Sequence, residues 1–389
     1  MKTTTILPAS RVNNIHEYYF SKKLSQIREM NSKGQDIINL GIGNPDFPPE
    51  RKVINTLIAD VRKKDAHGYQ SYTGIPELRK AYAYWYKKYF NVELNAEEEI
   101  LSLIGSKEGI LHISLTFINP GDGVLIPNPG YPTYTSVSKL VGAHIVNYNL
   151  DEKNNWEPNF DEIEKEDLTN IKLMWVNYPN MPTGAKASIK MLEKLVKFGR
   201  KHDIIICNDN PYSFILNDDY KSLLSISNSK GICIELNSMS KSHCMSGWRF
   251  GMVASNSTFI NWMLKVESNI DSGQFRPMQK AAVRALYLDA NWYKNINKKY
   301  KKRRILVEQI METLGCTIDT RQSGLFLWGK IPKKYVQSEE LTENILDKAK
   351  VFITPGFIFG DKGNKYIRIS LCEEEKILKE ANNRIKKIL

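Results

Sequence analysis

The stretch "SMSKSHCMSGWRFG", residues 238–251, follows the apolar run "GICIEL" at 231–236. It places one lysine, Lys241, among small hydroxyl residues, and one arginine, Arg249, eight residues later. In a chain with 55 Lys and Arg, most basic side chains are solvated, and Lys241 can be read as one more lysine on a loop. The alternative is a lysine that reacts as an amine, beside an arginine that binds an anion. The rest of the chain has to decide between these two readings.

Outward from this stretch, short apolar runs alternate with helical patterns from about residue 51 to 290. Helical patterns lie between several of the runs, at 106–117, 188–202 and 257–268, and another lies at 75–90. Apolar strands separated by helices predict an α/β fold with a mostly parallel sheet covered on both faces. The runs that predict strands are 99–104, 123–127, 143–148, 171–178, 204–207, 231–236 and 249–254.

The pattern changes after residue 290 and predicts a smaller α+β unit. One long helical pattern covers 291–314, and the apolar runs "LFLWGKI" at 325–331 and "YIRISL" at 366–371 follow, with a last helix near the C-terminus. The first 50 residues contain too few elements to fold alone. We therefore expect an N-terminal segment at 1–50 that joins the small domain, a large domain at 51–290 that carries the quoted stretch, and a small C-terminal domain at 291–389.

Composition excludes several classes of function. The net charge of +12 comes with scattered lysines, and the basic run "KKYKKRR" at 298–304 reads as the solvated face of a helix, so we expect no nucleic-acid partner. The N-terminus carries no secretory pattern, and no apolar run approaches the roughly 18 residues of a membrane span. Five cysteines without a CxxC pair favour free thiols in a reducing compartment, so we expect a cytoplasmic protein. We expect no metal site.

Special residues follow five of the predicted strands, at the edge of the sheet where ligands bind in parallel folds. Gly105, Ser106 and Lys107 open a helix and offer N–H groups and a hydroxyl to a phosphate, although an ordinary helix cap has the same composition. Asp209 follows a fully apolar strand, where a carboxylate is costly without a partner. A protonated ring nitrogen is such a partner, and a turn before Pro211 is the simpler alternative.

Further groups at the same edge suit one cofactor. Arg249 can bind a phosphate through two N–H groups, and Tyr131 can stack on a flat ring, although structural aromatics are commoner. Together these groups indicate pyridoxal phosphate. They offer a site for its phosphate (the phosphate seat), an acid for its ring nitrogen, an aromatic residue to stack on the ring, and a reactive lysine. The Lys241 amine forms a Schiff base only when it is unprotonated, and burial or nearby cations favour that form. Neither a Walker loop nor a dinucleotide fingerprint is present: "GIGNPD" at 41–46 has Asp46 where a third glycine would stand.

At this point the sequence resembles the class I and II aminotransferases, which are fold-type I pyridoxal-phosphate enzymes. The resemblance runs from "LGIGNPDFPP" to "YIRISL", and the string S-x-S-K-S-x-x-x-x-G-W-R-x-G at 238–251 is its most specific part. It implies that Lys241 carries the cofactor and later moves a proton, and that Asp209 binds the pyridine nitrogen. It also implies that Tyr212 binds the ring hydroxyl and that Tyr131 stacks on the ring. The residues implied to bind the phosphate are Ser106, Lys107, Ser238 and Arg249.

The resemblance also implies a substrate site and a partner. Arg368 in "YIRISL" matches the arginine that grips the substrate α-carboxylate, and Gly43 matches a glycine whose backbone touches it. Tyr69 matches a tyrosine that reaches the phosphate of the neighbouring subunit, which implies a homodimer with shared active sites. The implied activity is transfer of an amino group from an amino acid to a 2-oxo acid in a ping-pong reaction, with glutamate and 2-oxoglutarate as one pair.

One position departs from the family's pattern. The family usually reads N-P-T-G, and its asparagine bonds the ring hydroxyl and the substrate carboxylate; here that position is Met181, in "NYPNMPTG". A thioether cannot donate those bonds, so we expect Asn180 or Asn177 to compensate, or Tyr212 to hold the ring hydroxyl alone.

The sequence says less about the amino-acid substrate than about the family. Arg276 is a candidate second arginine for a dicarboxylate, whereas Tyr18, Tyr19 and Phe20 favour an aromatic or apolar side chain. Aspartate, aromatic amino acids and diaminopimelate-type donors all remain open.

Three other functions compete with the aminotransferase reading. A pyridoxal-phosphate C–S β-lyase would use the same lysine and phosphate groups, and would release pyruvate and ammonia without an oxo-acid acceptor. A regulator that binds the cofactor without catalysis would not need Lys241, and the short N-terminus leaves little room for a DNA-binding module. A serine hydrolase would need GxSxG, which does not occur.

Overall fold

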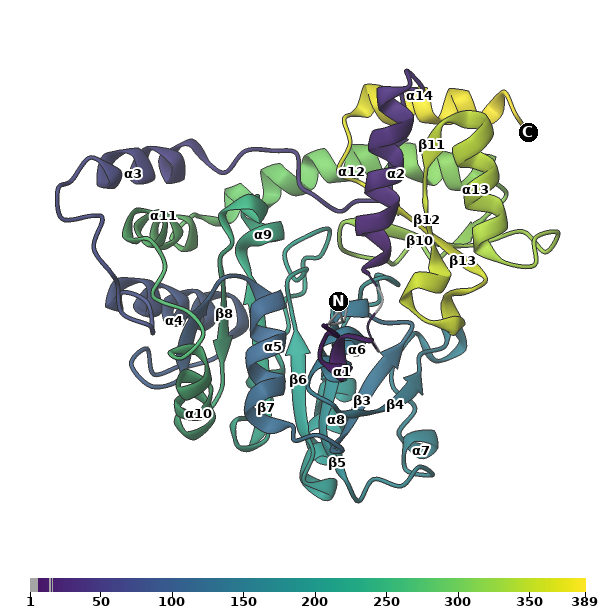
Figure 1. Cartoon of the computed structure of the whole chain (residues 1–389). Helices are drawn as coiled ribbons and strands as arrows, with labels where there is room; N and C mark the ends of the chain where they lie inside the picture. The colour runs from purple at the N-terminus through teal and green to yellow at the C-terminus, as the bar shows by residue number, and fades with distance from the viewer. Residues whose placement is uncertain (1–5, 14, 16) are drawn as a thin grey trace, which may run out of the picture.

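A seven-stranded sheet forms the larger part of the molecule. The structure, a computed structural model of the chain, describes residues 6–13, 15 and 17–389. The strand order is β2-β8-β7-β6-β5-β3-β4, and β8 alone in this sheet runs antiparallel to its neighbours (Figure 1). The strands are β2 (Ile100–Leu103), β3 (Gly123–Asn128), β4 (His144–Asn149), β5 (Ile171–Val176), β6 (Ile205–Asp209), β7 (Cys233–Ser238) and β8 (Gly251–Ala254). The arrangement confirms the predicted α/β fold with a mostly parallel sheet.

Helices cover both faces of this sheet, which explains why its central strands direct apolar residues to both sides. Along β5, Leu173 and Trp175 pack into one hydrophobic cluster, whereas Met174 and Val176 pack into another. The first cluster lies under α5 (Ser106–Phe117), α6 (Pro132–Leu140) and α10 (Ser257–Glu267). The second lies under α4 (Pro76–Phe90), α8 (Ile189–His202) and α11 (Arg276–Leu286). A strand buried on both sides loses the period-2 alternation of a half-exposed strand.

A smaller antiparallel sheet stands beside the large one. Its strand order is β12-β13-β10-β9, and it packs with α13 (Ser338–Ala349), which α14 (Glu375–Lys386) contacts in turn. The strands are β9 (Thr317–Ile318), β10 (Phe326–Lys330), β12 (Thr354–Pro355) and β13 (Tyr366–Ser370). The long helix α12 (Ala290–Thr313) runs from the side of the large sheet to the smaller one (Figure 1).

The N-terminal segment packs against the C-terminal part of the chain. β1 (Ile38–Asn39) pairs in parallel with β11 (Val351–Phe352), with Ile38 opposite Val351. Helix α2 (Tyr19–Ser32) stands beside α13 (Figure 1), and Lys23 of α2 binds Glu343 of α13 with an N–O distance of 2.7 Å. The chain then crosses to the large sheet through α3 (Arg51–Val61). The short helices are α1 (Ser10–Asn13), α7 (Phe160–Ile163) and α9 (Met239–Ser242), with 3-10 turns at Glu152–Asn154, Leu223–Ser225, Ser229–Gly231, Ser246–Trp248, Gly356–Phe359 and Asp361–Gly363.

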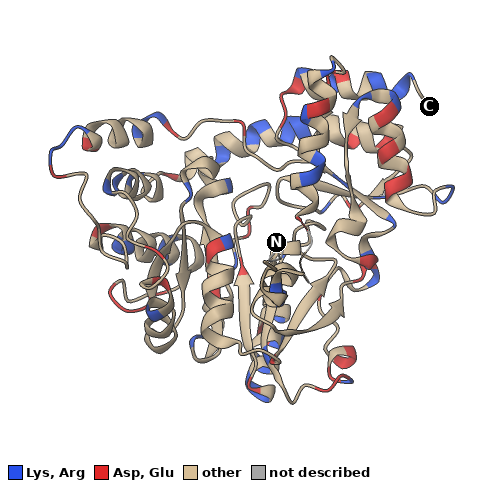
Figure 2. Cartoon of the chain, viewed as in Figure 1, with Lys and Arg blue, Asp and Glu red and all other residues tan. Residues whose placement is uncertain are grey.

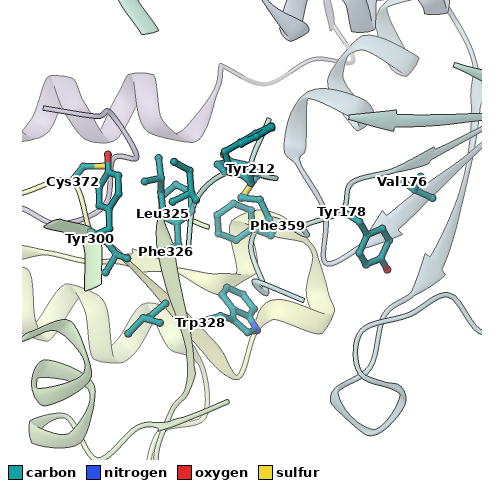
Figure 3. Close-up of a cluster of buried hydrophobic side chains, with 14 of the residues drawn as sticks. Val176, Tyr178, Tyr212, Tyr300, Leu325, Phe326, Trp328, Phe359 and Cys372 are labelled. Atoms are coloured by element: carbon teal, nitrogen blue, oxygen red, sulfur yellow. The ribbon is translucent and has the colours of Figure 1, made fainter. Parts of the chain in front are cut away.

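The hydrophobic core is continuous between the two sheets. Tyr212, which follows β6 of the large sheet, lies near Phe326 of β10, with 6.2 Å between the ring centroids (Figure 3). Phe359 and Trp328 extend the same cluster into the smaller sheet (Figure 3). Residues from both parts of the chain therefore meet where the large sheet ends.

The basic run at 298–304 does not lie wholly on a solvated face. Lysines and arginines are spread over many elements in the view of Figure 2, as the sequence indicated. Arg303 is an exception, because it is buried and makes a bidentate ion pair with Asp46, at 2.6 and 2.7 Å. The pair ties the loop after β1 to α12. Among the described residues, no helix is long and apolar enough to cross a membrane.

Candidate active site

Lys241 lies at the carboxyl end of β7, in the short helix α9. The helix starts directly after the strand, and the Ser238 hydroxyl caps it by accepting a hydrogen bond from the Ser240 N–H at 3.2 Å. The Lys241 Nζ donates to the Gly43 carbonyl at 2.5 Å. Burial lowers the pKa of the Lys241 ammonium below its usual range, and the nearby guanidinium groups of Arg368 and Arg249 lower it further. Both effects favour the neutral amine over the ammonium.

The N-terminus of α5 and the Arg249 side chain form the predicted phosphate seat. Gly105, the N-cap, has φ of +87°, and a Cβ at this position would overlap Nη2 of Arg249. The Arg249 guanidinium is held by backbone carbonyls, donating to Ser246 at 2.9 Å and to Ile104 at 3.2 Å. Ser106 and Lys107 follow in the first helical turn. Free N–H groups, the helix dipole and a fixed cation converge here, as anion binding requires.

Asp209 ends β6 and is fully enclosed. Its Oδ2 accepts a hydrogen bond from the Tyr134 hydroxyl at 3.1 Å, but its Oδ1 is buried and has no hydrogen-bond partner among the described residues. Burial raises the pKa of Asp209 to about 6, and the nearby hydroxyls of Tyr134 and Ser106 partly offset this. A buried carboxylate oxygen without a partner is unfavourable, so this atom indicates a missing N–H donor or cation.

Arg368 projects from β13 of the smaller sheet into the same space. Its Nη2 donates to the Gly41 carbonyl at 2.7 Å, and its guanidinium carbon lies 3.8 Å from the Phe326 ring centroid. The rings of Phe359 and Phe20 stand at 4.8 and 5.5 Å from the same carbon. Burial lowers the pKa of Arg368 to about 10, so it stays protonated at neutral pH, and its Nε has no partner among the described residues. A caged, charged and incompletely bonded arginine is suited to a carboxylate ligand.

Met181 occupies the position of the family's asparagine and touches Arg368. Its Sδ lies 3.2 Å from Nη1 of Arg368, and its own N–H donates to the Asn177 Oδ1 at 2.7 Å. The Asn177 amide also donates to the Asp209 carbonyl, so both of its ends are engaged by backbone. Asn180 accepts from Thr183 and does not line the cavity. Asn177, which lines the cavity, therefore has one amide N–H left for a ligand, whereas the Asn180 Nδ2, which has no partner among the described residues, lies outside the cavity.

One cavity of about 380 Å³ brings together ten of the eleven residues that the sequence proposes. They are Gly43, Ser106, Lys107, Tyr131, Asp209, Tyr212, Ser238, Lys241, Arg249 and Arg368. Tyr69 is the eleventh; its side chain is 95% exposed and lies outside the cavity of its own chain. The roles of these residues remain predictions.

The substrate candidates from the sequence divide into two groups. Arg276 is not in the cavity, since it pairs with Asp60 and Asp65 at 3.1 and 2.9 Å. Tyr18 and Phe20 do line the cavity, whereas Tyr19 lines a second cavity of about 480 Å³ that shares Tyr18, Phe20 and Tyr131 with the first.

Sequence reasoning missed several residues of the cavity wall. Tyr134 bonds Asp209, and Ser240 and Phe326 line the space beside Lys241. Ser240 lies in the quoted motif and could have been proposed with Ser238. Tyr134 and Phe326 carried no signal, because an aromatic residue inside a helix or strand predicts only core packing.

The residues fit pyridoxal phosphate. The orphaned Asp209 Oδ1 suits a protonated ring nitrogen, and the α5 terminus with Arg249 suits a phosphate. The side chain of Tyr212, a hydroxyl donor, lines the same space. Lys241 supplies the amine that an aldehyde needs.

Comparison with known proteins gives consistent matches over the whole chain. Residues 35–385 match the family described as aminotransferase class I and II. An LL-diaminopimelate aminotransferase of Dehalococcoides mccartyi is 38% identical over 375 residues, covering 96% of this chain and 96% of the relative. Another, from Aquifex aeolicus, is 37% identical and covers 98% of each chain.

Solved structures agree with this chain in fold. Apo BacF of Bacillus subtilis has a TM-score of 0.95 and 32% identity, and the match covers 99% of this chain and 98% of that chain. An aromatic aminotransferase from Pyrococcus horikoshii OT3 has a TM-score of 0.86 and 30% identity, with 94% and 98% covered.

Proposed function

The chain belongs to the class I and II aminotransferases, and we propose from this premise that Lys241, Asp209 and Arg368 carry its reaction. The enzyme transfers an amino group from an amino acid to a 2-oxo acid and uses pyridoxal phosphate. When bound, the cofactor supplies the carbonyl carbon that takes the amino group and the ring that accepts electrons. The family and cofactor expected from the motif are thereby confirmed.

Lys241 is proposed to hold the cofactor and then to move a proton at Nζ. The support is its lowered pKa and its position, with Nζ 2.5 Å from the Gly43 carbonyl and between the phosphate seat and Arg368. A neutral amine can accept the proton of a substrate α-carbon, and the ammonium that forms can return it elsewhere. The buried site limits loss of that proton to water.

Asp209 is proposed to bind the ring nitrogen of the cofactor through Oδ1. A positive N–H beside this oxygen would offset the burial that raises the pKa of Asp209 to about 6, and would keep the carboxylate charged. The Tyr134 hydroxyl fixes the other oxygen. The carboxylate in turn keeps the ring nitrogen protonated.

Arg368 and Gly43 are proposed to orient the substrate. Arg368 would bind the α-carboxylate through the face that its Gly41 contact leaves free, and the aromatic rings around it exclude water. Ser106, Lys107, Ser238 and Arg249 would hold the phosphate, with Tyr212 on the ring hydroxyl and Tyr131 on the ring face.

The observation that carries this assignment is the buried Asp209 Oδ1 without a partner, in one cavity with Lys241 and Arg368. The test is borohydride reduction of the purified enzyme followed by peptide mapping. The cofactor is expected on the peptide that contains Lys241. Lys107→Ala is the matched control, because Lys107 lines the same cavity and its loss should leave the label on Lys241. A label on another lysine would overturn the assignment.

For the substrates, we propose glutamate and 2-oxoglutarate as one pair and a diaminopimelate-type amino acid as the other donor. Two observations support a long donor with a polar end. Two curated relatives that cover 96–98% of the chain are LL-diaminopimelate aminotransferases. A second cavity also shares Tyr18 and Tyr131 with the site, and its lining includes both a cation, Lys139, and an anion, Asp361. A distal ammonium and carboxylate could both find partners there.

An aromatic donor is the second candidate, favoured by the rings of Tyr18, Phe20 and Tyr131 in the cavity wall. Steady-state kcat/KM for LL-diaminopimelate, phenylalanine and aspartate, each with 2-oxoglutarate, separates the candidates. Ser136→Trp would narrow the second cavity without touching the first, and should lower kcat/KM for diaminopimelate while sparing glutamate. Equal effects on both donors would exclude the second cavity as a side-chain site.

Three further proposals concern the whole protein. The working unit is proposed to be a homodimer in which Tyr69 serves the neighbouring site, which its exposed side chain allows. The division at residues 50 and 290 is proposed as the domain boundary, supported by the separate sheets and the start of α12 at Ala290. A cytoplasmic location is supported by the five cysteines, all described, free and buried.

A further inference from the structure

Behind Lys241, away from the cavity, the next two residues enter a buried chain of hydrogen bonds. His243 is 1% exposed and does not line the cavity. Its Nδ1 lies 2.9 Å from the Ser242 hydroxyl, and its Nε2 lies 3.0 Å from the Tyr293 hydroxyl. The chain thus connects α9, which carries Lys241, with the first turn of α12.

The series of hydrogen bonds continues to a third helix, α4, and this contact determines which group donates in each bond. The Trp85 indole of α4 donates to the Tyr293 oxygen at 2.9 Å. An indole N–H can only donate, so the Tyr293 hydroxyl is free to donate its own hydrogen to His243 Nε2. His243 then carries its proton on Nδ1 and donates to Ser242, a tautomer assigned from this network. The Ser242 hydroxyl points to the Ser238 carbonyl at 3.5 Å, at the start of α9.

A second hydrogen bond joins α12 to α9, and its donor is the residue that precedes Tyr293. The Trp292 indole donates to the Ser242 carbonyl at 2.9 Å. Consecutive residues of α12, Trp292 and Tyr293, therefore bind the last residue of α9, Ser242, and its C-cap, His243. A four-residue helix has too few internal hydrogen bonds to be stable alone, so its geometry depends on such external contacts.

The imidazole keeps one charge state over the range in which the enzyme works. Burial lowers the pKa of His243 to about 3, although the Ala285 carbonyl beside the ring opposes this. A neutral imidazole donates a hydrogen bond from one nitrogen and accepts one at the other, as this series of hydrogen bonds requires. The chain is therefore a fixed structural link and not a pH switch.

We propose that His243 and Tyr293 are positioning residues, which act through Ser242 to fix α9 and so hold Lys241 Nζ in its reactive place. This proposal rests on the role of Lys241 proposed above. Tyr293→Phe removes one hydroxyl and keeps the ring, which packs among Phe214 and Tyr89. His243→Asn restores an N–H near the Nδ1 position, whereas His243→Leu does not.

Two matched controls lie in the same helices. Tyr300 of α12 and Tyr82 of α4 are fully buried tyrosines whose hydroxyls have no partner among the described residues. Tyr300→Phe and Tyr82→Phe therefore each remove a buried hydroxyl that takes no part in the hydrogen bonds between α9, His243 and Tyr293.

Three measurements on the loaded enzyme test the proposal. Hydrogen exchange of the peptide spanning 239–245 should accelerate in Tyr293→Phe, with exchange elsewhere unchanged. The kcat should fall about tenfold or more, because small displacements of a reacting group are costly, while KM stays nearly constant. The pH midpoint of the bound cofactor's visible absorbance should shift in the same variant. His243→Leu should reproduce all three effects, and His243→Asn should recover part of them.

The controls decide the outcome. The proposal would be overturned if Tyr293→Phe behaved like the parent, because the effect would then be absent. It would also be overturned if Tyr300→Phe changed exchange, kcat and the pH midpoint equally, because the effect would then follow from the loss of any buried hydroxyl. If His243→Leu does not fold, Ser242→Ala, which breaks the chain at its last link, takes its place. A borohydride label on a lysine other than Lys241 would instead refute the proposed function, and the exchange data on 239–245 would still report whether the chain fixes α9.

Discussion

Asp209 shows at the scale of one residue how a binding group can weaken the protein that carries it. Its carboxylate is enclosed, one oxygen has no partner, and its pKa is raised by burial. Such a group is unfavourable until a cationic ligand arrives, so the proposed role in cofactor binding accounts for its presence, whereas stability does not.

Asp209→Asn is expected to stabilise the cofactor-free protein at neutral pH. Burial raises the pKa from 3.8 to about 6, so between these pH values the folded protein holds a proton that the unfolded chain releases. The contribution of this group to the free energy of unfolding therefore falls as the pH rises through that window, by up to about 3 kcal/mol. Urea unfolding near pH 7.5 should show the variant as the more stable protein, and near pH 4 the difference should vanish. A variant that is less stable at both pH values would contradict the reading.

Met181 leads to a second prediction at this scale. Asn180 lies outside the cavity, and Asn177, which lines it, already donates one amide N–H to the Asp209 carbonyl, so we expect that neither fully replaces the amide that the family uses. Met181→Asn should therefore tighten carboxylate binding about tenfold, or 1.4 kcal/mol. Calorimetric titration with 2-oxoglutarate measures it. Met181→Leu, which keeps the size and loses the sulfur, is the control and should not tighten binding. Unchanged affinity in Met181→Asn would mean that another group already makes the contact.

At the scale of elements, the start of α5 depends on one glycine. Gly105→Ala would strain a residue at φ +87° and would push Arg249 out of the phosphate seat. We expect a loss of about 1–3 kcal/mol in stability from the backbone and at least tenfold weaker cofactor binding from the displaced cation.

Gly121→Ala separates the two effects, because Gly121 has φ of +93° but open space around its Cβ position. It should lose stability and keep cofactor affinity, as measured by absorbance titration with pyridoxal phosphate. Equal loss of affinity in both variants would rule out the clash with Arg249 as the cause.

Elements with a strong local signal were predictable from the sequence. Helix α5 begins at Ser106 and ends at Phe117, as the pattern at 106–117 indicated, because a glycine precedes it and its apolar residues recur at helical spacing. The helices α3, α6 and α11 were not recognised. Two of them have a proline in the first turn, Pro132 as the first residue of α6 and Pro277 as the second residue of α11; proline suits this position, but it is also common in loops.

The sequence could predict those site residues whose positions are set by the ends of the strands. Lys241, Asp209 and Ser106 follow parallel strands, so sequence alone could bring them to one edge. The partners of long side chains could not be foreseen, since they depend on how separate elements pack. Arg276 pairs with Asp60 and Asp65, and Arg303 of the basic run pairs with Asp46.

At the scale of the whole molecule, the proposed dimer can be tested by mixing subunits. Combine a Tyr69→Phe subunit with a Lys241→Ala subunit that keeps its tyrosine. If Tyr69 serves the neighbouring site, the one remaining lysine works beside an intact tyrosine, and that site should have the kcat/KM of a parent site. Activity like that of the Tyr69→Phe homodimer would place the tyrosine in its own chain's site.

The pairing of β1 with β11 sets an order of events during translation. Ile38 has to wait for Val351, about 310 residues later, which at 5–20 residues per second is on the order of 15–60 s on the ribosome. During that interval, apolar side chains such as Leu40 have no native strand to cover them, and chaperones are their available partners. Arg368 emerges later still. A nascent chain therefore completes the proposed lysine and phosphate seat before it gains the arginine proposed for the substrate, and under that proposal cofactor capture can precede substrate binding in the life of each molecule.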